Sequence, residues 1–159
     1  MEALTTTQQN TQAGETAKQY IVTNIGGEQY GINIVYVDNI VRMQKITRVP
    51  KAQKFFTGVI NLRGEILPVM SLRKKFELEE DDYTNNTRII IVKLEQQGMV
   101  GLIVDSVKEV VTLNESDIEK TNLSITEGGQ AYVNAVGKLG NNLISLLNLH
   151  AVIIEKETA

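Results

Sequence analysis

The most informative stretch of the sequence is Gly58-Val59-Ile60-Asn61-Leu62-Arg63-Gly64-Glu65-Ile66-Leu67-Pro68-Val69. Two apolar runs rich in β-branched residues flank Arg63-Gly64, and this arrangement is typical of a tight β-hairpin. Gly64 can take the positive φ that such a turn often requires. Arg63 would then project its guanidinium from the tip of a rigid support. Without a nucleophile or a base beside it, this tip suits binding better than chemistry.

Arg63 has two interpretations on the sequence alone. In the functional one, the guanidinium reaches a carboxylate or a carbonyl of a partner. In the structural one, it is a turn arginine that pairs with a neighbouring acid such as Glu65. The residues by themselves leave both open.

The apolar spacing of the first half recurs in the second half. Shifting the chain by 70 residues places Gly31 on Gly101, and a later segment matches at a shift of 77 residues, with Ile66 on Leu143. The pattern therefore predicts two related β-units in tandem, at about 19–76 and 87–150, joined by an acidic linker at 77–86. Units this small bury little surface alone, so they should pack on each other, and their shared apolar seam would offer a binding groove.

Helix is sparse in the predicted structure. Ser71 is placed to cap a short helix that carries Leu72 and Phe76 on one face, and Asn148 to cap a second over 149–155. Residues 35–39 are compatible with one helical turn between strands. Residues 1–17 are rich in Thr and Gln and poor in large apolar groups, so they are expected to form a flexible tail.

Composition sets further bounds. The chain has 159 residues, 42% of them hydrophobic, a net charge of −3 and no cysteine. One ordinary domain or two small ones are expected, without disulfides or thiolate metal sites. No apolar run approaches the roughly 20 residues that span a bilayer, and the N-terminus does not resemble a signal peptide. A cytoplasmic protein with no direct membrane insertion is therefore predicted.

The charges are unevenly distributed. The stretch 42–75 is mostly basic, and the stretch 77–82 that follows is acidic. Most of these side chains are explained by solvated loop and strand faces. The functional alternative is a basic patch that steers an acidic protein partner.

No constellation for catalysis is visible. His150 is the single histidine and is expected at a surface or helix end, and no cluster suits a metal, a nucleotide phosphate or another cofactor. Single-stranded nucleic acid would need aromatic platforms in a basic groove, for which Phe55, Phe56 and Phe76 are the candidates. The acidic total argues against nucleic acid, so a non-catalytic binding module is predicted.

The sequence resembles the CheW family, the coupling proteins of bacterial chemotaxis. The likeness is carried by the motif at 58–69, by Ser71-Leu72-Arg73-Lys74-Lys75-Phe76 after it, and by the upstream segments 30–34 and 46–50, over roughly residues 18–155. It implies a mostly β fold with few short helices, in which two tandem five-stranded SH3-like barrels pack side by side.

The resemblance also implies a function. CheW-like proteins are adaptors that join the cytoplasmic tips of chemoreceptors to the regulatory domain of the histidine kinase CheA, at membrane-associated receptor arrays. The partner-binding positions carried over by motif are Arg63, Gly58, Asn61 and Gly64, with Val37 in the stretch that resembles a receptor-facing segment.

The chain departs from the family pattern at Asn39, where a glutamate is frequent, and at Ser71, where an aspartate is frequent. Asn39 is therefore a candidate for a changed partner preference. Two alternatives stay open: a small β-barrel that binds single-stranded nucleic acid or another ligand, and a scaffold variant of the same fold in a different signalling system.

Overall fold

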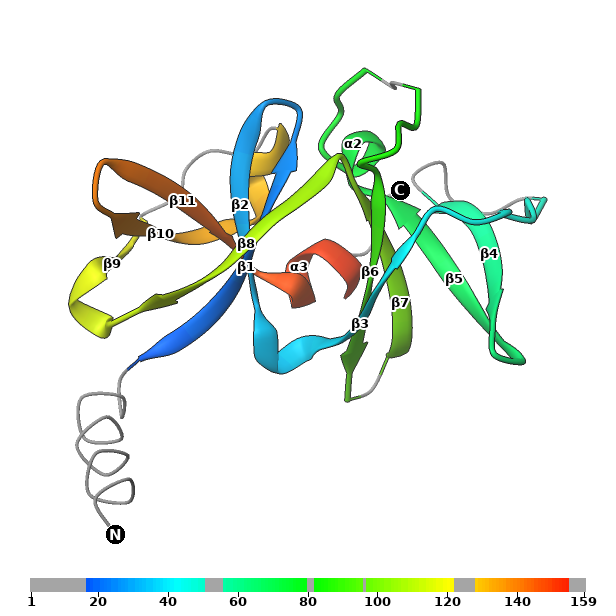
Figure 1. The fold of residues 1–159 in the computed structure, drawn as a ribbon, viewed down its shortest axis with the longest axis horizontal. Coiled ribbons are helices and arrows are strands. Elements are labelled where there is room, and N and C mark those ends of the chain that lie inside the picture. Colours follow the sequence, from blue (N-terminus) through cyan, green and yellow to red (C-terminus); the bar gives the residue numbers. More distant parts are fainter. Residues whose placement is uncertain (1–16, 51–55, 80–81, 96, 122–127, 155–159) are drawn as a thin grey trace, which may run out of the picture.

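The computed structural model describes residues 17–50, 56–79, 82–95, 97–121 and 128–154. It is mostly β, as predicted, with two sheets lying side by side and a few short helices (Figure 1). One sheet has six strands in the order β8-β1-β2-β11-β10-β9, and the other has five in the order β3-β6-β7-β5-β4. The sixth strand of the larger sheet is the short β9, which the sequence pattern did not indicate.

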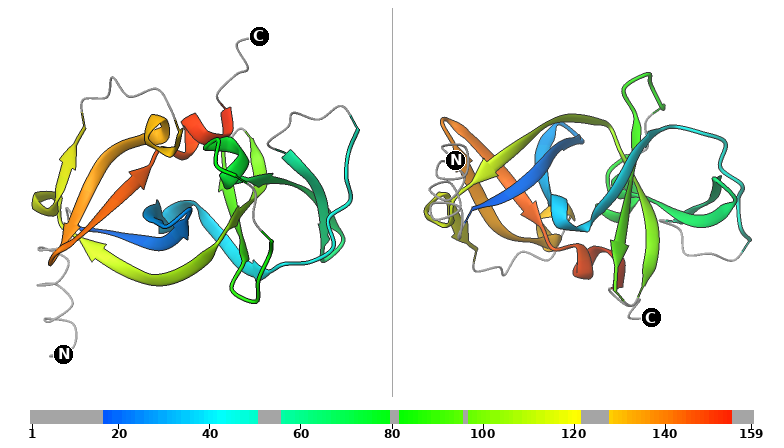
Figure 2. Two further views of the ribbon diagram at one scale, coloured as in Figure 1. Left: turned by 90° about the horizontal axis from the view of Figure 1, so that it is seen from above. Right: turned by 60° about the horizontal axis from the view of Figure 1, so that its bottom comes forward.

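The six-stranded sheet consists of β1 (Lys18–Ile25), β2 (Glu28–Asn33), β8 (Ser106–Leu113), β9 (Ile118–Lys120), β10 (Val133–Leu139) and β11 (Asn142–Leu147). The five-stranded sheet consists of β3 (Val37–Arg42), β4 (Phe56–Leu62), β5 (Glu65–Ser71), β6 (Arg88–Leu94) and β7 (Gly98–Val104). The helical elements are η1 (Ile34–Tyr36), α2 (Leu72–Lys75), η2 (Glu115–Asp117), η3 (Gly128–Tyr132) and α3 (Leu149–Ile154). Seen from above, α2 and α3 lie near the junction of the two sheets (Figure 2).

The predicted division into halves at 19–76 and 87–150 does not match the sheets. The five-stranded sheet uses β3 to β7, a continuous segment, and the six-stranded sheet uses β1 and β2 from before it and β8 to β11 from after it. The repeat is nevertheless visible, because β1 and β2 correspond to β6 and β7. Each repeat donates these two strands to the sheet of the other repeat, so the two units exchange strands instead of folding one after the other.

The exchanged strands dock through matching parallel pairs. In the six-stranded sheet β2 lies parallel to β11, with Gly31 opposite Leu146. In the five-stranded sheet β7 lies parallel to β5, with Gly101 opposite Val69. Gly31 and Gly101 are the residues that the 70-residue shift superimposes. The periodicity thus identified equivalent strands correctly but could not tell which sheet each one joins.

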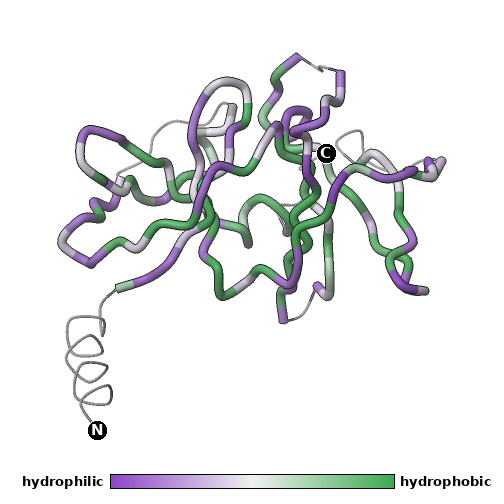
Figure 3. The backbone as a smooth tube through the Cα atoms, viewed as in Figure 1, coloured by the Kyte–Doolittle hydropathy of each residue, from purple (hydrophilic) through white to green (hydrophobic). Residues whose placement is uncertain are grey.

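Among the described residues, the buried apolar side chains form three clusters. One fills the six-stranded sheet around Leu113, another fills the five-stranded sheet around Ile89, and the largest lies between the sheets. Neighbouring residues of one strand alternate between clusters. In β6, Ile89 belongs to the cluster of the five-stranded sheet, and Ile90 belongs to the cluster between the two sheets. Hydrophobic residues accordingly concentrate on the central elements, and the outer turns are mostly hydrophilic (Figure 3).

The predicted seam between the sheets is therefore filled by a hydrophobic core of described residues. Its buried residues include Phe76 and Leu102, which are 1% and 0% exposed. Continuous apolar runs such as β6 follow from this arrangement, because both faces of the strand are covered.

The short helices follow the predicted caps. The Ser71 hydroxyl accepts a hydrogen bond from the Lys74 N–H at 3.2 Å and begins α2, and Asn148 Oδ1 accepts from the Ala151 N–H at 3.3 Å in α3. The helical turn expected at 35–39 is η1, one residue earlier and shorter. The predicted tail at 1–17 lies outside the described residues, apart from its last residue.

Candidate functional site

Arg63 and Gly64 form the two-residue turn between β4 and β5, as predicted. Gly64 has a φ of 88°, and Arg63 also has a positive φ, 54°. Positive φ at both central residues defines the type I′ turn that matches the twist of a hairpin. The Asn61 Oδ1 atom accepts a hydrogen bond from the Gly64 N–H at 2.9 Å. Asn61 and Gly64 therefore build the turn, and Arg63 is the exposed side chain that the turn presents.

The structural alternative for Arg63 finds no support among the described residues. Within them the guanidinium has no ion pair or hydrogen bond, and Glu65 does not pair with it. Arg63 is therefore a long exposed cation on a hairpin tip, unpaired within the described residues, and its guanidinium is free to donate charge-assisted hydrogen bonds.

Gly58 has a structural role at the other end of β4. A Cβ atom at Gly58 would lie 2.2 Å from the Thr47 carbonyl oxygen, and the φ of this glycine is 154°. Thr47 and Val59 exchange two backbone hydrogen bonds, both of 2.8 Å, across this contact. The bridge ties the chain that leaves β3 onto β4, and only glycine allows the close approach.

Gly58→Ala is expected to lower the free energy of unfolding by more than about 2 kcal/mol, because the new methyl group collides with backbone and the φ becomes strained. Chemical denaturation measures the loss. Gly64→Ala is the matched control, since its φ is also positive but nothing lies within 4 Å of the added Cβ. It should cost about 1–2 kcal/mol. Equal losses would show that the Thr47 contact is unimportant.

Val37 and Asn39 lie in β3, and Arg63 lies at the tip of the β4–β5 hairpin. The strands β3 and β4 are the two ends of the five-stranded order and are joined, among the described residues, through the Thr47–Val59 bridge beyond β3, so Val37 and Asn39 are not cross-strand neighbours of Arg63. A bulge falls between Val37 and Asn39, and the Asn39 Oδ1 atom accepts from the N–H of Ile40 at 2.8 Å. Val37 is half-buried against the inter-sheet core.

Exposed apolar residues close to Val37 in the chain were not predicted from the sequence. Val35 and Ile34 are 74% and 37% exposed in η1, and Ile40 is 36% exposed in β3, which follows η1 directly. We name Ile34, Val35 and Ile40 the crossover patch, because the chain passes there from one sheet to the other. The apolar run at 34–37 was the available signal. Two further exposed residues, Ile66 and Leu143, occupy equivalent positions of the two hairpins at 61% and 63% exposure.

Only some of the side chains in the predicted basic patch are exposed. Arg42, Lys45 and Arg48 are exposed, whereas Lys75 is buried and its Nζ atom lies 5.5 Å from the centre of the Tyr132 ring. Lys51 and Lys54 lie outside the described residues.

Two of the three phenylalanines predicted as platforms for nucleic acid are covered by other residues. Phe76 is buried and stacks on Tyr132, and Phe56 packs against the inter-sheet core. Phe55 lies outside the described residues. The structure thus gives no support to the nucleic-acid alternative.

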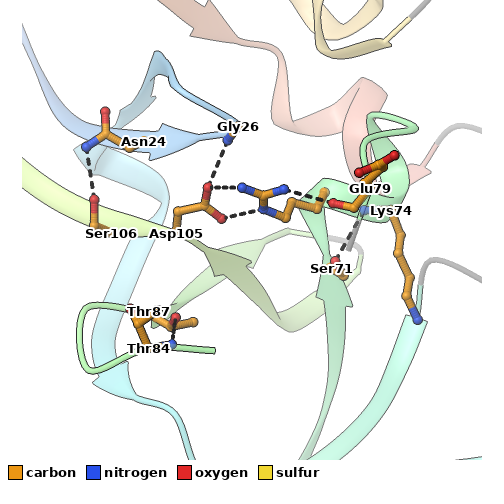
Figure 4. Close-up of polar contacts among 10 residues, drawn as sticks. Asn24, Gly26, Ser71, Lys74, Glu79, Thr84, Thr87, Asp105 and Ser106 are labelled. Atoms are coloured by element: carbon orange, nitrogen blue, oxygen red, sulfur yellow. Dashed lines mark hydrogen bonds and ion pairs between the residues drawn. The ribbon is translucent and has the colours of Figure 1, made fainter. Parts of the chain in front are cut away.

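A polar network surrounds Asp105, between β7 and β8 (Figure 4). Its carboxylate accepts two hydrogen bonds from the Arg73 guanidinium, at 2.9 and 2.8 Å, and one from the Gly26 N–H at 2.9 Å. Burial raises the pKa of this carboxyl, but the hydrogen bonds from Arg73 and Gly26, together with the Arg73 charge, outweigh burial and lower the net pKa below its usual value. Asp105 is therefore ionised at neutral pH.

The described residues hold no group of three or more side chains suited to a metal ion. His150 is exposed in α3, as predicted, with its ring edge-on to Tyr36 at 6.0 Å. None of the described helices is long and apolar enough to cross a membrane.

The fold and these positions define a class of protein: a two-sheet β protein with an exposed arginine on a hairpin tip and exposed apolar side chains, and without a metal or catalytic cluster among the described residues. Residues 19–157 match the family model of the CheW-like domain. The chain belongs to the CheW family.

Individual relatives agree with this assignment. The chain is 36% identical over 145 residues to the chemotaxis protein CheW of Bacillus subtilis, covering 91% of this chain and 92% of that protein. It is 32% identical over 148 residues to the chemotaxis protein CheW of Klebsiella aerogenes, with coverages of 92% and 89%. The crystal structure of the scaffolding protein TtCheW from Thermoanaerobacter tengcongensis superimposes with a TM-score of 0.78 at 36% identity, covering 85% of this chain and 91% of that one.

Membership of the CheW family confirms the prediction of a non-catalytic adaptor. The chain is a non-catalytic scaffold protein of bacterial chemotaxis, and the mostly β prediction agrees with the solved relative.

Proposed function

We propose that this chain couples the cytoplasmic tips of chemoreceptors to the regulatory domain of the kinase CheA, in the cytoplasm at receptor arrays. The observation that carries the proposal is the Arg63 tip: an exposed cation on a type I′ turn, at the motif on which the family resemblance rests. The proposal assigns partner contacts to Arg63, Val37 and Asn39. Gly58, Asn61 and Gly64 serve indirectly, because they shape the hairpin.

The crossover patch adds a second kind of contact. Exposed Ile34, Val35 and Ile40 suit the apolar side chains of a helical receptor tip, which would lie against this surface. Arg63, at the tip of the β4–β5 hairpin, suits a carboxylate or carbonyl. One scaffold with two surfaces of different chemistry on different strands can hold two partners at once, and this is what coupling requires.

Arg63→Ala tests the assignment. The side chain is exposed and unpaired within the described residues, so the free energy of unfolding should change by less than about 1 kcal/mol. Partner binding should weaken by about 1–3 kcal/mol, the range for a charge-assisted hydrogen bond. Thermal denaturation and titration calorimetry against purified receptor tip and CheA regulatory domain measure the two quantities.

Arg63→Lys is the matched control. It keeps the charge but lacks the planar fork, so it should recover little binding if the contact is bidentate. Normal binding of every partner by both variants would remove Arg63 from the site. Unfolding by Arg63→Ala would make the residue structural instead.

A further inference from the structure

The chain crosses between the two sheets twice. The first crossing is η1, between β2 and β3, and the second is the single residue Asp105, between β7 and β8. The N–H of Asp105 donates to the Asn24 carbonyl at 3.0 Å, and the Asn24 side-chain amide donates to the Ser106 hydroxyl at 2.9 Å. The second crossing is therefore held by directed hydrogen bonds on the side of β1.

The Asp105 carboxylate extends these bonds to both sheets. Gly26, in the turn between β1 and β2, belongs to the six-stranded sheet, and Arg73, in α2, directly follows β5 of the five-stranded sheet. Arg73 Nη1 also donates to the Glu79 carbonyl at 2.8 Å, which orients the guanidinium from its other side. The Asp105 carboxylate thus joins the β1–β2 turn of the six-stranded sheet to α2, which follows β5 of the five-stranded sheet (Figure 4).

We infer that Arg73 and Asp105 are positioning residues, a clamp that fixes the angle between the two sheets and so sets how surfaces on both sheets face a common assembly. The orientation of surfaces toward a common assembly rests on the proposed function, whereas the clamp itself does not. The inter-sheet core holds the sheets together, but apolar contact is not directional. A bidentate guanidinium–carboxylate pair is directional, and the side chains here are only 23% and 31% exposed, so solvent screens them incompletely.

The angle can be measured directly because the chain has no cysteine. Glu65→Cys and Asn142→Cys place one spin label on each sheet at exposed turn-flanking positions. Pulsed electron paramagnetic resonance on the full chain then gives a distance distribution between the labels. The unaltered clamp should give one narrow distribution. Arg73→Gln and Asp105→Asn should each at least double its width or shift its mean by several ångströms.

Two further variants make the result specific. Arg73→Lys keeps the charge without the fork, so it should restore only part of the narrow distribution. Lys138→Gln is the matched control, because Lys138 pairs with Glu119 at 3.9 Å within the six-stranded sheet and does not touch the crossing. It should leave the distribution unchanged.

The outcomes separate the clamp from the proposed function. Distance distributions that stay narrow in folded Arg73→Gln and Asp105→Asn overturn the clamp. If either variant fails to fold, the Arg73→Lys distribution decides: one as narrow as that of the unaltered clamp overturns the proposal. These distances need no partner, so they stand even if the unaltered chain binds neither receptor tip nor CheA. If it binds both, the clamp variants should bind each partner alone within about twofold, while the three-component complex forms at least tenfold less well. Unchanged three-component assembly despite a widened distribution would remove the link to coupling.

Discussion

A fragment of residues 19–76 is expected to have no cooperative unfolding transition. It contains β1 to β5, yet β1 and β2 pair with β8 and β11 in the intact chain, and β3 and β5 pair with β6 and β7. Every one of those partners is missing from the fragment. The whole free energy of unfolding, typically about 5–15 kcal/mol for a domain, should therefore be lost, and calorimetry with circular dichroism would show it.

Complementation is the control for this fragment. Residues 77–159 carry β6 to β11, so they supply each strand that the first fragment lacks. Mixing or co-expressing the two pieces should restore a folded complex with the spectrum of the intact chain. A monomeric 19–76 fragment that melts cooperatively would mean that the halves fold in tandem after all, and that the strand exchange is not needed for stability.

The sequence predicted local structure well and pairing poorly, for a physical reason. The β4–β5 hairpin and the caps at Ser71 and Asn148 depend on residues within a few positions of one another, so turn and cap chemistry is sufficient to find them. Which sheet β1 joins depends on contacts about 90 residues away in β8, such as Ile21 with Val110. Two similar repeats offer nearly equivalent alternatives for such pairs, and periodicity does not distinguish them.

The residues of the candidate site also divide into those that local sequence predicts and those that depend on the folded chain. Arg63 was predictable because a two-residue turn exposes its central side chain. The apolar run at 34–37 signalled the crossover patch only in part, because the run does not show which side chains face outward, and the nearby Ile32 and Val37 turn inward. The Arg73–Asp105 clamp joins residues 32 positions apart, and only the folded chain brings them together.

Phe76→Ala is expected to give the largest loss of stability among single substitutions proposed for this chain. The Phe76 ring is 1% exposed and lies 5.2 Å from the Tyr30 ring and 5.7 Å from the Tyr132 ring, centre to centre. Phe76 follows α2 beside the five-stranded sheet, whereas Tyr30 and Tyr132 belong to the six-stranded side. Truncation opens a cavity between the sheets and should lower the free energy of unfolding by about 3–5 kcal/mol.

The melting transition should stay single while its midpoint falls by roughly 10 °C, given the few degrees per kcal/mol usual for a chain of this size. One transition is expected because the exchanged strands make each sheet depend on the other through the core that Phe76 fills. Tyr83→Ala is the control, since that ring is 53% exposed and its loss should change stability by less than about 0.5 kcal/mol. Differential scanning calorimetry distinguishes the alternatives: two separate transitions in Phe76→Ala would mean that the sheets are independent units and that the cluster between them is only an interface.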